Sequence, residues 1–121
     1  MAGKMFNIDK DSEWKVDPPK HTKTNAYPLV NPKTAPGCTF EFHITEISPG
    51  GVAADDVHPG EDHLFYCLSG RAWGKIEGEE FLVEPGCALW VPQGCVHSFD
   101  VIGGEVFRIG VWFSPPRNIW G

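Results

Sequence analysis

Turn signals recur at short intervals along this chain, and they constrain its fold more than any other feature of the sequence. Their spacing leaves room for short strands but not for helices of ordinary length. Glycine and proline, at 14 and 11 of the 121 residues, also favour strands joined by tight turns. We therefore expect an all-β fold, either a barrel or a sandwich. The signals are Ser48-Pro49-Gly50-Gly51, Ser69-Gly70, Glu77-Gly78, Glu84-Pro85-Gly86, Pro92-Gln93-Gly94 and Ile102-Gly103-Gly104.

Apolar and polar residues alternate between these turns, which is typical of strands with one buried face. In residues 39–47, Phe40, Phe42 and Ile44 alternate with polar residues, and the turn signal at 48–51 is expected to end this strand. The other expected strands are residues 63–68, 71–76, 80–83, 88–91, 96–101 and 105–113.

The length of 121 residues allows one domain, and the sequence divides it into three parts. Residues 1–37 carry several prolines and predict an extended N-terminal arm with a short edge strand at residues 5–8. Residues 38–116 hold the alternating segments and predict the barrel, and residues 117–121 form a C-terminal tail.

Charge and apolar runs limit the partners and the location. Ten Lys and Arg against 16 Asp and Glu give a net charge of −6, which argues against nucleic acid as a partner. No run approaches the ~18–20 apolar residues that span a membrane, and the N-terminus lacks the apolar core of a secretory signal. We expect a cytoplasmic protein with no membrane partner. Because the sequence has no CxxC pair, its four cysteines are expected to be reduced thiols.

One carboxylate and three histidines, Asp56, His58, His63 and His97, indicate metal chemistry. Asp56 and His58 are two residues apart, so in a strand both side chains point to the same face. Neutral imidazoles with one carboxylate suit divalent Fe, Mn, Co, Ni or Zn, and the residues alone do not choose among these metals. Spacing alone also leaves open that some of these histidines lie at the surface or bond to the backbone.

The residues around these histidines resemble both sequence motifs of the cupin superfamily. The first motif, G-x5-H-x-H-x(3,4)-E-x6-G, is represented by Gly50, Asp56, His58, His63 and Gly70. The second, G-x5-P-x-G-x2-H-x3-N, is represented by Gly86, Pro92, Gly94, His97 and Val101. The resemblance covers residues 38–116. It implies a small single-domain cupin, whose fold is a double-stranded β-helix or jelly-roll barrel.

Three positions depart from these motifs. Asp56 stands where the first His is expected, His63 stands where Glu is expected, and Val101 replaces Asn. The first two changes keep a set of three histidines and one carboxylate, so the resemblance implies one divalent metal held by Asp56, His58, His63 and His97. Asp is shorter than His, which leaves open that Asp56 binds through a water or not at all. The resemblance also implies a homodimer, with the arm and the end Asn118-Ile119-Trp120 crossing its interface.

Strand alternation predicts an apolar pocket beside the metal. Counting inward from His63 places Phe65 and Cys67 on the ligand face, and counting from His97 places Phe99 and Val101 there. Such walls suit a small organic ligand, although the same residues could simply fill the barrel.

Candidates for further roles lie outside the motifs. Tyr66 and Glu46 could act as acid or base, and Arg108 could hold a substrate carboxylate or form a salt bridge to Glu41 or Glu46. Of the two remaining histidines, His43 is expected at the surface or behind the ligands, and His21 is expected to be exposed in the arm.

The sequence thus predicts a metalloenzyme acting on a small oxygenated organic molecule bound at the metal. A dioxygenase would use Fe(II) and O2. A redox-neutral lyase or isomerase would use the metal as a Lewis acid. The alternative is a non-catalytic module that binds a small molecule or a metal, because a fold does not fix a function.

Overall fold

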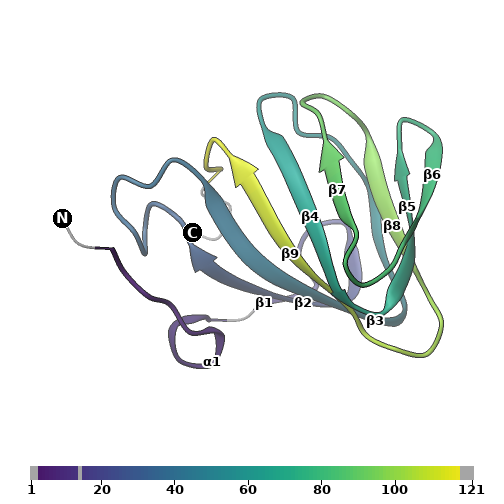
Figure 1. Ribbon diagram of the computed structural model, residues 1–121, viewed down its shortest axis with the longest axis horizontal. Coiled ribbons are helices and arrows are strands. Elements are labelled where there is room, and N and C mark those ends of the chain that lie inside the picture. Colours follow the sequence, from purple (N-terminus) through teal and green to yellow (C-terminus); the bar gives the residue numbers. More distant parts are fainter. Residues whose placement is uncertain (1–2, 14, 118–121) are drawn as a thin grey trace.

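The computed structural model describes residues 3–13 and 15–117, and more than half of these residues lie in strands (Figure 1). All strand pairs are antiparallel, so the all-β prediction is confirmed. The elements are α1 (Ile8–Asp11), β1 (Lys15–Val16), β2 (His21–Val30), β3 (Glu41–Asp56), β4 (Asp62–Ser69), β5 (Arg71–Ile76), β6 (Glu79–Val83), β7 (Ala88–Val91), β8 (His97–Ile102) and β9 (Phe107–Ser114).

The strands form one curled sheet in the order β6-β5-β8-β3-β9-β4-β7, and β2 adds to β3 outside this order. Strand β3 is the long element that joins the two sides of the curl. Its first half pairs with β9, from Glu41 opposite Phe113 to Ile47 opposite Phe107. Its second half pairs with β8, from Val52 opposite Asp100 to Asp56 opposite His97.

Strand β3 continues through the turn signal at residues 48–51, where the sequence predicted an end. Gly50 has a φ of +81°, and a Cβ on Gly51 would lie 2.7 Å from the carbonyl oxygen of Thr22. These glycines therefore bend the strand against β2 without ending it, because β2 pairs with β3 on both sides of the bend. The bend carries β3 from its pairing with β9 to its pairing with β8.

The N-terminal part also differs from the sequence prediction. In place of an edge strand at residues 5–8, the structure has the short helix α1, because the Asn7 side chain accepts a hydrogen bond from the main-chain nitrogen of Asp9 and caps it. Within the predicted arm, β1 and β2 extend the sheet beside β3. The limits of arm, barrel and tail stay predictions, and Asn118, Ile119 and Trp120 lie outside the described residues.

Inward-facing apolar side chains fill one end of the curl. Phe107 is fully buried there, and its register partner in β3 is Ile47. Cys38, Cys67, Cys87 and Cys95 are all free thiols. No helix in the described part of the chain is long and apolar enough to cross a membrane.

Candidate metal centre

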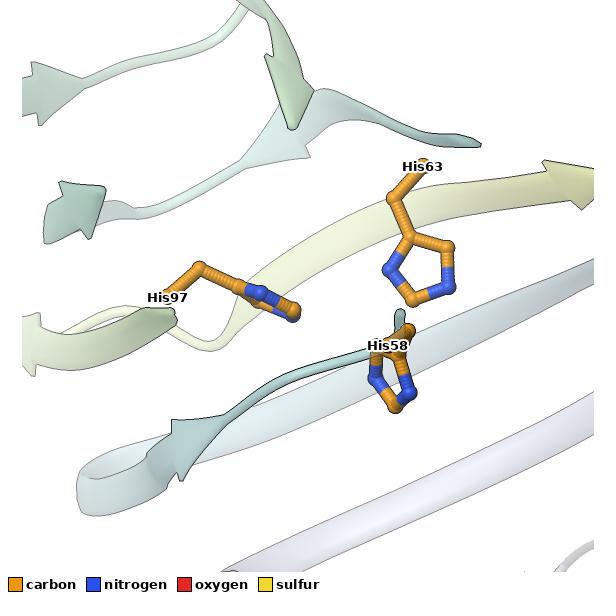
Figure 2. Close-up of side chains that lie close together, drawn as sticks. All are labelled: His58, His63 and His97. Atoms are coloured by element: carbon orange, nitrogen blue, oxygen red, sulfur yellow. The ribbon is translucent and has the colours of Figure 1, made fainter. Parts of the chain in front are cut away.

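Three histidine side chains converge at the other end of the curl. His58 follows the end of β3, His63 is the second residue of β4, and His97 begins β8. Each offers a ring nitrogen, and these three atoms lie within 4.8 Å of one another. Figure 2 shows the three side chains lying close together, each carried by a separate segment. All three side chains are buried, with at most 7% of their surface exposed.

The strand registers explain why these histidines meet. His97 lies opposite Asp56 across the β3–β8 pair, and Asp56 precedes His58 by two residues. His63 lies opposite Phe113 of β9 on the inward face of β4. The Nδ1 atom of His97 is 3.2 Å from the carbonyl oxygen of Cys95, and donation there leaves Nε2 with its lone pair. The three rings thus come from three different segments, which the strand pairing brings together.

The chemistry of this cluster fits a metal ion. Both ring nitrogens of His63 are buried, and neither has a hydrogen-bond partner among the described residues. Burial lowers the pKa of His58 to about 4 and that of His63 to about 3, and it also lowers the pKa of His97. Neutral imidazoles carry the lone pairs that divalent transition metals bind. Buried polar atoms without partners are rare, and ligation would satisfy them.

Two hydrogen bonds to one carboxylate oxygen of Asp56 orient its second oxygen toward this cluster. Its Oδ1 accepts hydrogen bonds from the main-chain nitrogen of Val57 at 2.9 Å and from Lys20 Nζ at 3.3 Å. Its Oδ2 lies 3.3 Å from His58 Nε2. Burial raises the pKa of Asp56, but the Val57 amide, His58 and Lys20 together lower it below its usual value. The carboxylate is therefore charged at neutral pH.

A second carboxylate and an arginine, which the sequence interpretation missed, lie on the other side of the cluster. The Oε2 atom of Glu61 is 3.1 Å from Arg117 Nε and 3.7 Å from His63 Nε2. Arg117 Nη1 lies 3.4 Å from His58 Nε2. One signal was visible in the sequence: Glu61 precedes His63 by two residues, as Asp56 precedes His58. Arg117 had no such signal, because it follows the last strand and only the fold brings it back.

A cavity of about 180 Å³ opens beside the histidines. Phe65 and Phe99 line it, as the alternation predicted, whereas Cys67 and Val101 are not among its lining residues. His43 and His21 line the same cavity, so all five histidines of the chain meet there. His43 is buried, and burial lowers its pKa to about 3.

The remaining candidates lie away from the cavity. Arg108 Nε forms an ion pair with Glu46 Oε2 at 3.2 Å, which is the salt-bridge alternative of the sequence interpretation. Tyr66 is 47% exposed. None of the three is among the residues that line the cavity. Their catalytic roles have no geometric support.

A curled antiparallel sheet with buried histidines beside an internal cavity is the architecture of a jelly-roll protein. The sequence profile described as "Cupin domain" matches residues 43–113. That stretch is more than half of the chain, so this protein belongs to the cupin domain family. The predicted family and the jelly-roll fold are both confirmed.

Similar solved structures support the same fold. One is the polyketide cyclase RemF from Streptomyces resistomycificus, at 25% identity and a TM-score of 0.79, covering 98% of this chain and 86% of that one. Another is KdgF from Halomonas sp., at 19% identity and a TM-score of 0.82, covering 99% of this chain and 100% of that one. At 19% identity, the similarity to KdgF shows the fold alone.

Among curated proteins, the chain is similar to the tetracenomycin polyketide synthase protein TcmJ from Streptomyces glaucescens. The two are 28% identical over 99 residues, which are 80% of this chain and 66% of TcmJ. An uncharacterized Streptomyces coelicolor protein is 36% identical over 58 residues, which are 48% of this chain and 54% of that protein. The chain thus spans slightly less than two thirds of the length of TcmJ and about half of the length of the Streptomyces coelicolor protein.

Proposed function

We propose that this cupin is a metal-dependent enzyme that acts on a small oxygenated organic molecule bound at the metal. His58, His63 and His97 would hold one divalent transition metal, chosen among Fe, Mn, Zn, Ni and Co, with Asp56 as the fourth ligand. The observation that carries this proposal is the convergence of three buried, neutral imidazoles within 4.8 Å on the wall of a cavity. Cytoplasmic location is part of the same proposal.

The similarity to RemF and TcmJ favours a redox-neutral, lyase-like reaction on a polyketide-type substrate over a dioxygenase reaction. A bound divalent metal would supply Lewis-acid polarisation of a substrate carbonyl. The residues of the chain supply the surroundings. Phe65, Phe99 and Phe113 give the cavity an aromatic wall that excludes water from a bound molecule. Asp56 keeps its charge beside His58 and so balances part of the charge of a cation.

A second copy of this chain is the protein partner that we propose. On the outer face of the sheet, Trp90, Leu64, Trp112 and Phe42 lie in register across β7, β4, β9 and β3. Trp90 is 64% exposed and Leu64 is 40% exposed. Such a continuous apolar row is characteristic of protein interfaces. Sedimentation of the wild type and of Trp90→Lys tests this, since a dimer should become monomeric, and a monomeric wild type would contradict it.

Elemental analysis of protein purified without added metal tests the metal site. Near-stoichiometric transition metal is expected, and His97→Ala should lose most of it. Trace metal in both proteins, even after reconstitution with Fe(II), Mn(II), Zn(II) and Ni(II), would overturn the site. Turnover of polyketide-type diketones and phenols without oxygen supports the redox-neutral reaction. Oxygen consumption with Fe(II) would select the dioxygenase, and saturable binding without product would select the non-catalytic module.

Asp56→Asn tests the fourth ligand. Even residues that only orient ligands change metal affinity by about 10–100-fold, so loss of a ligating carboxylate should weaken affinity by at least that factor. A chelator competition titration measures this affinity. Asp55→Asn is the matched control, because it removes the same charge from the neighbouring exposed residue. Equal affinities in the two variants would leave a site of three histidines.

A further inference from the structure

We propose that Arg117 binds an anionic oxygen of the substrate, so that the cavity selects organic anions such as carboxylates and enolates over neutral molecules of the same shape. This inference rests on the proposed function, because it assigns the substrate class of the same site. Arg117 lines the cavity, and the sequence interpretation had placed the anion-binding role on Arg108 instead.

Arg117 is held in place before any ligand arrives. Its main-chain nitrogen donates to Oε2 of the buried Glu41 at 3.0 Å, which fixes the chain just after β9. Its Nε pairs with Glu61 at 3.1 Å, and its guanidinium carbon lies 5.8 Å from the centre of the Phe113 ring. Because one main-chain contact and two side-chain contacts position this residue, binding a ligand would cost little additional conformational entropy.

The end of the guanidinium is directed at the histidine cluster. Nη1 lies 3.4 Å from His58 Nε2, which is a long contact to a neutral imidazole. An anionic oxygen is a stronger acceptor for a guanidinium than a neutral nitrogen is. A carboxylate or an enolised dicarbonyl places two oxygens close together, so one can face the histidines while the other meets Arg117. The guanidinium has N–H donors besides Nε, so it can donate to that oxygen while Nε stays paired with Glu61.

The charges around the site also favour an anion once the metal is bound. Three carboxylates, those of Glu41, Asp56 and Glu61, surround the site with the two cations Lys20 and Arg117. They leave one negative charge, which a divalent cation would convert into one positive charge. The opposite wall is apolar, with Phe99 and Ile109 among its lining residues. The cavity therefore fits a molecule with an anionic, oxygen-rich head and an apolar body.

A matched pair of probes tests this inference by calorimetry on the zinc-loaded protein at pH 7.5. Salicylate and salicylamide share a ring and a hydroxyl group, but only the first carries a carboxylate. The wild type should prefer salicylate. Arg117→Gln should weaken salicylate binding by about tenfold or more and leave salicylamide within about threefold, because only the charged probe loses a charge-assisted hydrogen bond. The salicylate affinity of Arg117→Lys should lie between those of the wild type and Arg117→Gln.

Arg108→Gln is the control, since Arg108 is also paired with a glutamate but lies outside the cavity lining. It should leave both affinities unchanged. Zinc content is measured on every variant, so a wild type without zinc contradicts the proposed function itself. A zinc-loaded wild type that binds both probes equally, or binds neither, overturns the anion inference. Equal salicylate affinities of the wild type and zinc-loaded Arg117→Gln would also overturn it. If Arg117→Gln fails to fold, Arg117→Lys takes its place in this comparison.

Discussion

Both ends of the curled sheet bury their inward side chains, but they differ in what the buried atoms require. At the closed end, which is the end filled by apolar side chains, Phe107 is fully buried and needs only close packing. At the histidine end, His63 is 4% exposed, and both of its ring nitrogens are buried without a hydrogen-bond partner among the described residues. Burial at the first end stabilises the fold, whereas burial at the second costs free energy that ligand binding can recover.

Phe107→Ala should have the largest effect on this comparison. Removing a fully buried aromatic side chain from the closed end should lower the free energy of unfolding by about 3–5 kcal/mol. Denaturant titration of the metal-free protein measures this change. A loss below about 1 kcal/mol would mean that the closed end does not carry the stability of the fold.

Acidification should destabilise the histidine end in the metal-free protein. The pKa of His43 is about 3 in the folded state, against about 6.5 when unfolded, so the unfolded state binds more protons below pH 6.5. Stability is therefore fully present above pH 6.5 and is lost as the pH falls toward 3. Between pH 8 and pH 5, His43 alone should account for a loss of about 2 kcal/mol.

Denaturant titrations across this range, with a chelator present, check the pH prediction. His43→Leu should show a pH dependence that is smaller by about 2 kcal/mol than that of the wild type. An unchanged slope in His43→Leu would show that His43 does not titrate at the lowered pKa.

His63→Leu sharpens the comparison in the opposite direction. It replaces two buried nitrogens, which lack hydrogen-bond partners among the described residues, by apolar atoms. The metal-free variant should be more stable than the wild type by about 1 kcal/mol, while metal affinity falls sharply. Paired melting curves and metal titrations separate these effects. A destabilised metal-free variant would show that His63 supports the fold.

Tyr66→Phe should have the smallest effect. The Tyr66 side chain is 47% exposed on the outer face, so loss of its hydroxyl should change stability by less than about 0.5 kcal/mol. Metal content and turnover should match the wild type. A large loss of turnover would restore Tyr66 as a catalytic candidate.

The strands and the inward positions of Phe65 and Phe99 could be predicted because alternation is a local property of the chain. The prediction that β3 ends at residues 48–51 was wrong for a related reason. A run such as Ser48-Pro49-Gly50-Gly51 breaks regular backbone, but it does not show whether a neighbouring strand continues on both sides. The pairing of β2 with β3 is that missing information.

The histidine cluster could be predicted from its motif spacing, whereas the positions of Arg117 and His21 in the cavity could not. Arg117 is 59 residues from His58 in the sequence, and only the path of β9 brings them together. His21 was expected to be exposed, but the pairing of β2 with β3 places it on the cavity wall. Long-range pairing, which leaves no periodic signal, decides both positions.

The bend in β3 has a consequence for how the chain folds. Because β3 pairs with β9 on one side of the bend and with β8 on the other, neither side of the curl closes before the C-terminal strands are present. The long stretch of chain between β3 and its partners β8 and β9 must form a closed loop before these strands can pair. Such loop closure makes folding slow in proteins dominated by distant contacts. During synthesis, the inward face of β3 would thus stay exposed until β8 and β9, which come later in the chain, have left the ribosome. The bend at Gly50 and Gly51 therefore links the order of folding to the shape of the site.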